Sequence, residues 1–122
     1  MESRIHFGNQ AEDAVVAYLI QQKYHICARN FRWMGGEIDI IARKDDVLAF
    51  VEVKARRECQ FHLSEVIVPA KQLKIIKTAR RYIFQQAYDA MVFRFDVALL
   101  SIVENDWNIK YIANAFTDAH GW

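Results

Sequence analysis

The sequence predicts an α/β fold in which helices flank a mixed β-sheet. Three observations lead to this class. A helical apolar pattern comes first, two strand patterns joined by a short polar turn follow, and a second helical pattern, opened by a proline, precedes two more strands. The predicted order of elements is αβββαββ. No linker, repeat or low-complexity stretch divides the 122 residues, so we expect one domain over residues 1–122.

Both predicted helices have an apolar face. The first helix spans residues 8–23, and its apolar positions are Ala11, Ala14, Val15, Tyr18 and Leu19. The second helix opens at Pro69, because proline lacks the N–H group that the first helical position does not need. Its predicted apolar stripe consists of Leu73, Ile76, Ala79, Ile83 and Ala87. The predicted strands cover residues 25–32, 37–43, 47–55, 92–100 and 107–113.

The two strands around the short polar turn at 44–46 form a predicted β-hairpin. With a two-residue loop, Asp39 faces Glu52 and Glu37 faces Lys54 on one side of the hairpin. The other side is wholly apolar and is predicted to be core; it carries Ile38, Ile40, Ala42, Ala49, Val51 and Val53. A slip of one residue would place Asp39 among the valines, so the apolar pattern favours this register.

The charged end of the hairpin has the chemistry of a metal site. Opposed residues have Cβ atoms about 5 Å apart, so Asp39 and Glu52 would repel each other unless a cation lies between them. Oxygen ligands suit Mg²⁺ or Mn²⁺. Lys54 projects to the same face about 6 to 7 Å further along, where it can assist a water or a phosphate. The alternative is a salt-bridge ladder on a solvated sheet end, with Glu37 paired to Lys54.

The near-neutral net charge of +1 hides a segregation of charge. Residues 54–81 contain eight basic and two acidic residues, a net charge of +6, and the remainder has a net charge of −5. On the second predicted helix, a basic stripe follows the helical repeat: Lys71, Lys74, Lys77 or Thr78, and Arg81. Such a stripe is either a solvated helix face or a surface that contacts nucleic-acid phosphates.

Cysteine usage and hydropathy predict a cytoplasmic protein with no membrane contact. Cys27 and Cys59 form no CxxC pair and are too few for a disulfide framework, although one disulfide remains an alternative. The N-terminus lacks the apolar core of a signal peptide, and no apolar run approaches the roughly 20 residues of a membrane span. The four histidines have no zinc-site spacing with the cysteines.

A D…E-x-K pattern over a hairpin between two helices resembles the PD-(D/E)XK nuclease superfamily. That superfamily has a restriction-endonuclease-like core and includes Holliday junction resolvases. More narrowly, the chain is similar to the YraN family of small bacterial proteins, described as predicted endonucleases. The motifs that carry the resemblance are GxxAE (8–12), ARNFR (28–32), GGEID (35–39), FVEVKAR (50–56), PAKQ (69–72), RFDV (94–97) and NAF (114–116).

The resemblance implies roles for individual residues. Asp39 and Glu52 become the catalytic and metal-binding carboxylates, and Lys54 becomes the catalytic lysine. Glu12 matches an additional acidic metal ligand of resolvase-type members; alternatively it is a first-turn carboxylate that faces the helix dipole. The nucleic-acid contacts implied or predicted beside the site are Arg56, Lys71, Gln72 and Lys74. Ile38 departs from the superfamily pattern, which has proline before the aspartate.

The resulting expectation is a Mg²⁺- or Mn²⁺-dependent endonuclease that hydrolyses phosphodiester bonds in DNA, including structured or branched DNA. It would hold DNA through the backbone, and by analogy with resolvases it would be a homodimer. The alternatives are a nucleic-acid-binding module that has lost catalysis and a protein-interaction domain with a structural charged sheet end. Trp33 is interpreted as a turn-capping aromatic, with base stacking as the alternative. Asp96 is a satisfied buried carboxylate or a partner of Arg94, with catalysis as the alternative.

Overall fold

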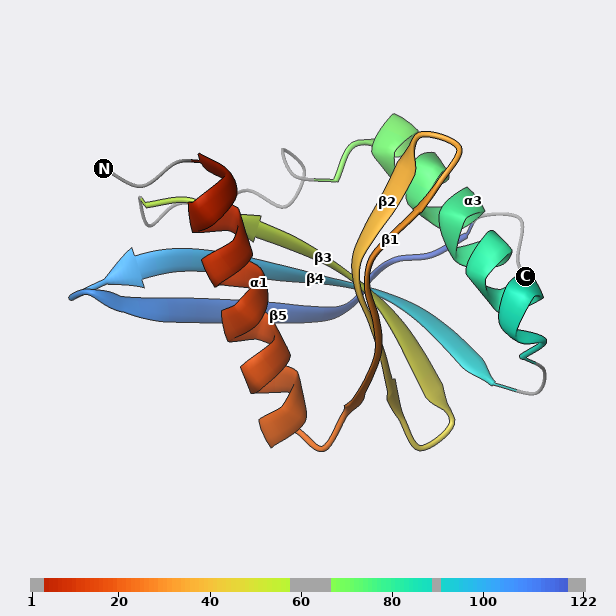
Figure 1. Ribbon diagram of the computed structural model, residues 1–122, viewed down its shortest axis with the longest axis horizontal. Helices are drawn as coiled ribbons and strands as arrows, with labels where there is room; N and C mark the ends of the chain where they lie inside the picture. Colours follow the sequence, from red (N-terminus) through yellow and green to blue (C-terminus); the bar gives the residue numbers. More distant parts are fainter. Residues whose placement is uncertain (1–3, 58–66, 89–90, 119–122) are drawn as a thin grey trace.

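The computed structural model describes residues 4–57, 67–88 and 91–118, and in these ranges the elements follow the predicted order (Figure 1). Helix α1 spans Arg4–Gln21. Three strands follow: β1 (His25–Trp33), β2 (Gly36–Lys44) and β3 (Val47–Ala55). Helix α3 (Pro69–Gln86) then leads to β4 (Val92–Val103) and β5 (Asp106–Phe116). Cys59, His62 and His120 lie outside the described residues.

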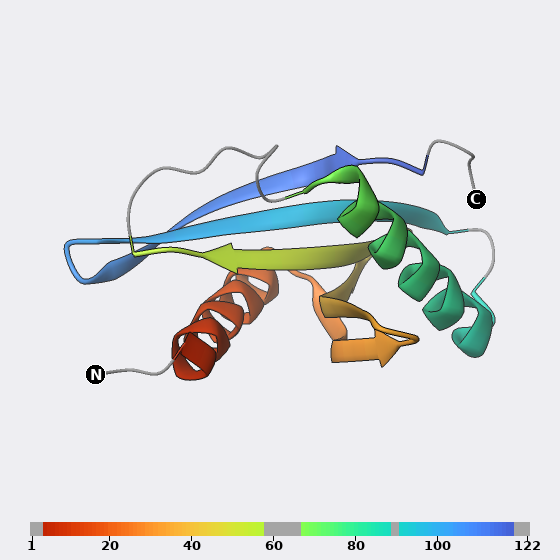
Figure 2. The same ribbon diagram turned by 90° about the horizontal axis from the view of Figure 1, so that it is seen from above.

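The strands form one mixed sheet in the order β1-β2-β3-β4-β5. Strands β3 and β4 are parallel, because α3 carries the chain back between them, and the other neighbours are antiparallel. This confirms the predicted α/β class and is consistent with a restriction-endonuclease-like core. Figures 1 and 2 show α1 and α3 packed on the sheet at different positions, with the tip of the β1–β2 hairpin beside α3. None of the described helices is long and apolar enough to cross a membrane.

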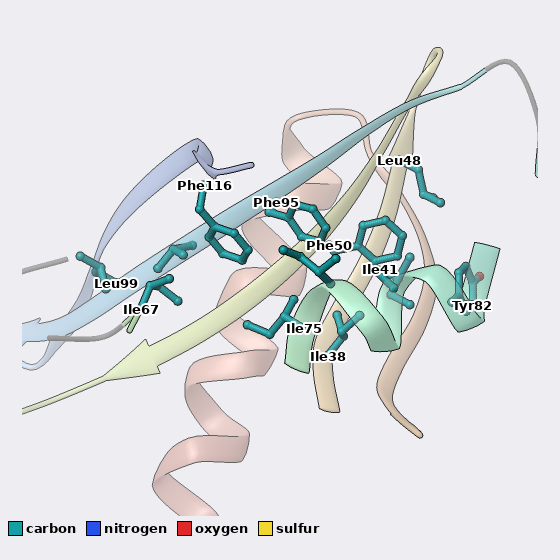
Figure 3. Close-up of a cluster of buried hydrophobic side chains, with 13 residues drawn as sticks. Ile38, Ile41, Leu48, Phe50, Ile67, Ile75, Tyr82, Phe95, Leu99 and Phe116 are labelled. Atoms are coloured by element: carbon teal, nitrogen blue, oxygen red, sulfur yellow. The ribbon is translucent and has the colours of Figure 1, made fainter. Parts of the chain in front are cut away.

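The two helices cover opposite faces of the sheet, and each closes a separate apolar cluster. On the α3 face, aromatic and aliphatic side chains of the strands pack against the helix (Figure 3). Prominent members of this cluster are Ile38, Ile41, Phe50, Ile75, Tyr82 and Phe95. On the α1 face, the cluster contains Ala11, Val15, Leu19, Ile40, Val51 and Leu100. The predicted apolar face of the first helix is therefore confirmed.

The predicted register of the hairpin is correct, but only one of its two sides is predicted to be core. Ile40 pairs with Val51 and Arg43 with Leu48, as the two-residue loop requires. Most of the predicted apolar side packs on α1, but Ile38 packs in the α3 cluster. The other side of the hairpin is also core near the turn, because α3 covers it. A strand buried on both faces cannot be recognised by alternation alone.

The predicted apolar stripe of the second helix needs a correction. Ile76 and Ala79 are buried as predicted, but Leu73 is 52% exposed and Ala87 lies beyond the helix in a left-handed C-cap. The buried face instead consists of Ile75, Ile76, Thr78, Ala79 and Tyr82. This rotation has a physical reason: the β1–β2 hairpin as well as the sheet packs on α3, so the contact face is turned toward both.

Asp96 is a satisfied buried carboxylate, as one of the sequence interpretations expects. It is fully buried and accepts two hydrogen bonds of 2.8 Å from the Arg94 guanidinium. It also accepts hydrogen bonds from the Tyr111 hydroxyl and, at 2.9 Å, from the Asn114 N–H. The β4–β5 register shifts between Phe95 and Val97. At this shift the Asp96 side chain accepts the hydrogen bond from the Asn114 N–H, in place of a backbone carbonyl of the strand ladder.

Candidate metal and nucleic-acid site

The two central carboxylates of the predicted site line one cavity of about 500 Å³. The cavity lies between the start of β2, the middle of β3 and the first turns of α3. Its lining residues are Gly35, Gly36, Glu37, Asp39, Glu52, Val68, Ala70, Lys71, Lys74 and Ile75. The structure therefore brings Asp39 and Glu52 together with two of the predicted nucleic-acid contacts, Lys71 and Lys74.

Asp39 lies where β2 and β3 part. The described ladder between the two strands reaches Ile40 and Val51, and just beyond it Asp39 Oδ2 accepts a hydrogen bond of 2.7 Å from the Val53 N–H. Asp39 thereby satisfies a backbone donor that the strand pairing leaves open. The predicted direct pairing of Asp39 with Glu52 is thus replaced by a contact with the backbone one residue further on.

The electrostatic environment of Asp39 disfavours its charge. Burial, and next the charge of Glu52, raise the pKa of the Asp39 carboxyl to about 8, against the lowering effect of the Val53 N–H bond. The charges of Glu12 and Glu37 contribute in the same direction. A carboxyl that is costly to ionise among other carboxylates is the situation that a bound cation relieves.

Glu52 already has a cationic partner from α3. Its Oε1 lies 2.7 Å from Lys71 Nζ, and the side chains of Glu52 and Lys71 are 11% and 33% exposed, respectively. Lys71 follows the proline that begins the helix, so the first turn of α3 points this ammonium into the cavity. It neutralises Glu52 in the place where a metal ion would do so.

A second group of carboxylates surrounds Asn30, which sequence reasoning missed. Asn30 Nδ2 donates hydrogen bonds to Glu12 Oε1 at 3.0 Å and to Glu37 Oε1 at 3.2 Å. The neighbouring β1–β2 pairs place Asn30 opposite Asp39. Its φ of 51° is left-handed, a conformation that asparagine tolerates better than most residues. The only sequence signal was its place in the ARNFR motif.

The predicted ladder between Glu37 and Lys54 is wrong. Glu37 instead contacts β1, through the hydrogen bond from Asn30 and through Arg32 Nε at 3.4 Å. The cause is the parting of β2 from β3, which leaves β1 as the nearer neighbour of Glu37. Lys54 is exposed and lies two residues beyond Glu52, but it is not among the residues that line the cavity.

The remaining predicted contacts are further from the cavity. Glu12 does not line it and is bound to Asn30, with Arg29 Nη2 at 3.8 Å. Gln72 donates its side-chain amide to the Ile67 carbonyl at 3.3 Å. Arg56 is exposed at the end of β3, where its N–H donates to the Leu100 carbonyl. The nucleic-acid roles of Gln72 and Arg56 stay predictions.

The cavity offers a pair of carboxylates, which is a set of ligands that suits a hard divalent cation. Asp39 and Glu52 offer oxygen ligands in one cavity, which is the ligand type that Mg²⁺ and Mn²⁺ prefer. Within residues 4–57, 67–88 and 91–118, no group of three or more histidine, cysteine, aspartate or glutamate side chains is gathered closely enough to hold a metal ion. Glu12 therefore belongs to the surroundings of this pair in the structure as it stands.

Residues 11–100, which include this cavity, match the uncharacterised protein family UPF0102. The chain belongs to the UPF0102 family. Among curated relatives, a UPF0102 protein of Syntrophus aciditrophicus is 38% identical over 122 residues, covering 99% of this chain and 96% of the relative. A UPF0102 protein of Geobacter sulfurreducens is 40% identical over 115 residues, covering 93% and 90%. One from Nitrosomonas europaea is 38% identical over 120 residues, covering 98% and 100%.

UPF0102 membership confirms the resemblance to the YraN family over nearly the whole chain. The family is described as uncharacterised, so membership brings a set of relatives without an activity. What the protein does has to be inferred from the residues of the cavity.

Proposed function

We propose that this UPF0102 protein is a divalent-metal-dependent endonuclease that hydrolyses phosphodiester bonds in DNA. The observation that carries the proposal is the cavity in which Asp39 and Glu52 meet Lys71 and Lys74. Two carboxylates provide for a metal ion, and two ammonium groups at the same opening provide for the phosphate backbone. The resemblance to PD-(D/E)XK nucleases supports the same chemistry.

In the proposed mechanism, Asp39 and Glu52 hold Mg²⁺ or Mn²⁺ through their carboxylate oxygens. When bound, the ion would supply Lewis-acid activation of a water and of the scissile phosphate. Binding keeps Asp39 in its charged form, which burial and Glu52 otherwise disfavour. Lys71 then leaves Glu52 and contacts the substrate phosphate. Lys54, on the same face of β3 as Glu52, stabilises charge that develops on the phosphate or orients the attacking water.

Asn30 has a positioning role in this proposal. It ties Glu12 of α1 to Glu37 of β2 and lies opposite Asp39 in the sheet. Both glutamates influence the charge state of Asp39. Glu12, held by Asn30, would be available as a further carboxylate beside a bound cation.

The direct test is cleavage of supercoiled and four-way-junction DNA in Mg²⁺ or Mn²⁺. We expect wild-type protein to nick or cut these substrates, and chelation to abolish cleavage. Lys54→Ala and Asp39→Asn should each lower the rate by at least about 100-fold, the scale of a lost catalytic group. Asp13→Asn, which changes an exposed carboxylate of α1, is the matched control. Equal background cleavage by wild type and Lys54→Ala would refute the catalytic role.

A catalytically inactive nucleic-acid-binding module is the second candidate. The observation that favours it is the ion pair between Lys71 and Glu52, which supplies a positive charge without a metal. Calorimetric titration with Mn²⁺ separates the two candidates. An endonuclease site should bind the ion in wild type and lose it in Asp39→Ala and Glu52→Ala, whereas the inactive module should give no heat in any of the three.

A further inference from the structure

A second cavity, of about 330 Å³, adjoins the carboxylate cavity and has a different character. Trp33 and Met34, at the tip of the β1–β2 hairpin, form one side, and Lys74, Lys77 and Thr78 of α3 form the other. The two cavities share Gly36 and Lys74. We call this second cavity, together with Arg81 beside it, the Trp33 cleft.

The aromatic side of the Trp33 cleft is open to solvent. Trp33 is 37% exposed and Met34 is 84% exposed, so both side chains are accessible to a ligand. The guanidinium of Arg81 lies over the Trp33 ring at 5.7 Å from its centroid, and it lies at the same distance from the Phe84 ring. Trp33 is therefore held by a cation on the helix and also faces the cavity.

The basic side of the Trp33 cleft lacks acidic partners. In the part of the chain that the structure describes, no carboxylate forms an ion pair with Lys74, Lys77 or Arg81, and none lines the cavity. Neighbouring cations on the same helix differ, because Lys71 pairs with Glu52 and Arg80 pairs with Asp118. Arg81 Nε is moreover buried without a hydrogen-bond partner. Positive charge left uncompensated beside an exposed tryptophan points to an anionic, aromatic ligand.

The geometry of the Trp33 cleft is fixed by two glycines. Met34 and Gly35, with φ of 50° and 81°, form the tight turn of the hairpin. At Gly36 the hairpin lies so close to α3 that a Cβ atom would overlap Thr78 Oγ1 and approach the Lys74 carbonyl oxygen to 3.1 Å. The hairpin tip and the helix are therefore locked together, and a ligand would meet a preorganised surface.

We propose that the Trp33 cleft binds an unpaired nucleobase of the substrate, stacked on Trp33, with the adjacent phosphates on Lys74 and Lys77. Exposed aromatic rings beside basic side chains are the means by which proteins bind single-stranded nucleic acid. A base inside a duplex is stacked on both faces, so we expect Trp33 to bind only a base that is unpaired. This inference deepens the proposed function and rests on it, since it assigns the cleft to the same substrate.

The position of the cleft relates the base to the site of cleavage. Trp33 pairs with Gly36, which lies three residues before Asp39 on β2. At the usual rise of a strand this separation is about 10 Å. Stacked nucleotides rise roughly 3.4 Å each, so the distance corresponds to about three nucleotides. We therefore expect the substrate to contain a single-stranded segment, such as a flap, gap, loop or junction arm, a few nucleotides from the cut.

The test is binding of fluorescein-labelled oligonucleotides, measured by anisotropy in the presence of EDTA so that no cleavage occurs. The probes are an oligothymidylate, an oligouridylate and a blunt DNA duplex. Trp33→Ala should weaken single-strand binding by about 5- to 100-fold and duplex binding by less than about 2-fold. Trp33→Phe should retain most of the affinity. Leu73→Ala, which removes an exposed apolar side chain from the same helix, should change neither.

A second readout follows Trp33 itself, in full-length protein with Trp107→Phe and Trp122→Phe. Oligothymidylate should quench the remaining fluorescence, because a stacked base lies on the ring. Unchanged emission with bound oligonucleotide, or an equal loss of single-strand and duplex binding in Trp33→Ala, would overturn the inference. The two single-stranded probes show whether DNA or RNA is preferred.

The inference and the proposed function can fail separately. If single-strand binding depends on Trp33 but no metal-dependent cleavage occurs, the nuclease proposal is refuted and the role of the Trp33 cleft stands. If Trp33→Ala leaves metal-dependent cleavage of single-stranded, branched and duplex DNA unchanged, the role of the Trp33 cleft is refuted and the nuclease proposal stands.

Discussion

At the scale of single residues, the charge state of Asp39 is the most informative feature of the site. Its carboxyl is partly buried, lies near Glu52 and accepts a hydrogen bond from the Val53 N–H. Its pKa is raised from an ordinary 3.8 to about 8. A metal ion bound at this carboxylate would compete with the proton, and metal affinity would then be coupled to pH.

The first prediction concerns stability and pH. Because the folded-state pKa of Asp39 is raised, the folded protein binds more protons than the unfolded chain between about pH 4 and 8. The contribution of Asp39 to the free energy of unfolding should therefore fall as pH rises, by at most about 1.4 kcal/mol per pH unit. Urea unfolding at pH 6 and pH 8 should show a smaller fall in Asp39→Asn than in wild type.

Two controls separate Asp39 from the general titration of the protein. Asp13→Asn removes an exposed carboxylate and should keep the wild-type pH dependence. Addition of Mg²⁺ should stabilise wild type more at pH 8 than at pH 6, because the ion binds the charged carboxylates. Identical pH profiles of wild type and Asp39→Asn would show that burial does not raise this pKa.

At the scale of elements, the β1–β2 hairpin and α3 both contribute to each cavity, and Gly36 sets the distance between the hairpin and the helix. A methyl group there would overlap Thr78, which is buried and donates its hydroxyl to the Lys74 carbonyl at 2.8 Å. We predict that Gly36→Ala destabilises the protein by about 1–3 kcal/mol, the usual cost of overpacking. Gly36→Ala with Thr78→Ala should recover part of this loss in denaturant unfolding.

A matched glycine substitution is available in α1. Nothing lies within 4 Å of a Cβ atom at Gly8, so Gly8→Ala should be neutral or stabilising by up to about 1 kcal/mol. Equal stability of Gly36→Ala and Gly8→Ala would show that the hairpin can move away from α3.

The second prediction at this scale concerns the contacts of Asp96 between the paired strands β4 and β5. Asp96 is fully buried and compensates the Arg94 guanidinium. Removing one partner of a buried ion pair leaves the other charge uncompensated. Asp96→Asn should therefore lower the free energy of unfolding by about 3 kcal/mol, whereas Asp106→Asn at the exposed start of β5 should change it by less than about 0.5 kcal/mol. A neutral Asp96→Asn would contradict the structural role.

At the scale of the whole molecule, charge is divided between a basic helix surface and an acidic cavity. The net charge of +1 conceals this division, because residues 54–81 have a net charge of +6. Three of the opposing acidic residues, Glu12, Glu37 and Asp39, cluster around Asn30 and the cavity. A bound divalent cation would offset part of the acidic charge and leave the lysines of α3 to attract DNA.

This division predicts a specific salt dependence of DNA binding. If Lys74 and Lys77 each contact a phosphate, the double variant with both lysines changed to alanine should reduce the slope of log affinity against log salt. The expected reduction is about 0.7 to 0.9 per lysine. Lys110→Ala, on exposed β5, should keep the wild-type slope. Anisotropy titrations at several salt concentrations measure this, and an unchanged slope in the double variant would exclude the helix from the interface.

The fold could be predicted from sequence where local chemistry decides it. The β2–β3 register follows from alternation around a short turn, and the start of α3 follows from Pro69. The exposed position of Leu73 and the burial of Ile75 could not be foreseen, because the orientation of α3 depends on how close Gly36 lets the hairpin approach.

The carboxylates of the candidate site could be predicted from the sequence, but the contacts that surround them could not. Asp39 and Glu52 belong to a recognisable hairpin pattern. Asn30 contacts Glu12 and Glu37 across two different elements, and Lys71 reaches Glu52 from a third, so no local pattern contains these contacts. The described pairing of β2 with β3 ends at Ile40 and Val51, and the alternation of polar and apolar residues does not predict this end.

The most direct test is a crystal structure of the wild-type protein soaked in Mn²⁺, with anomalous data at the manganese edge. We predict a manganese peak within coordination distance of both Asp39 and Glu52, with Lys71 moved away from Glu52. Absence of a peak in the cavity, with the Lys71–Glu52 ion pair intact, would contradict a metal-dependent function of this site.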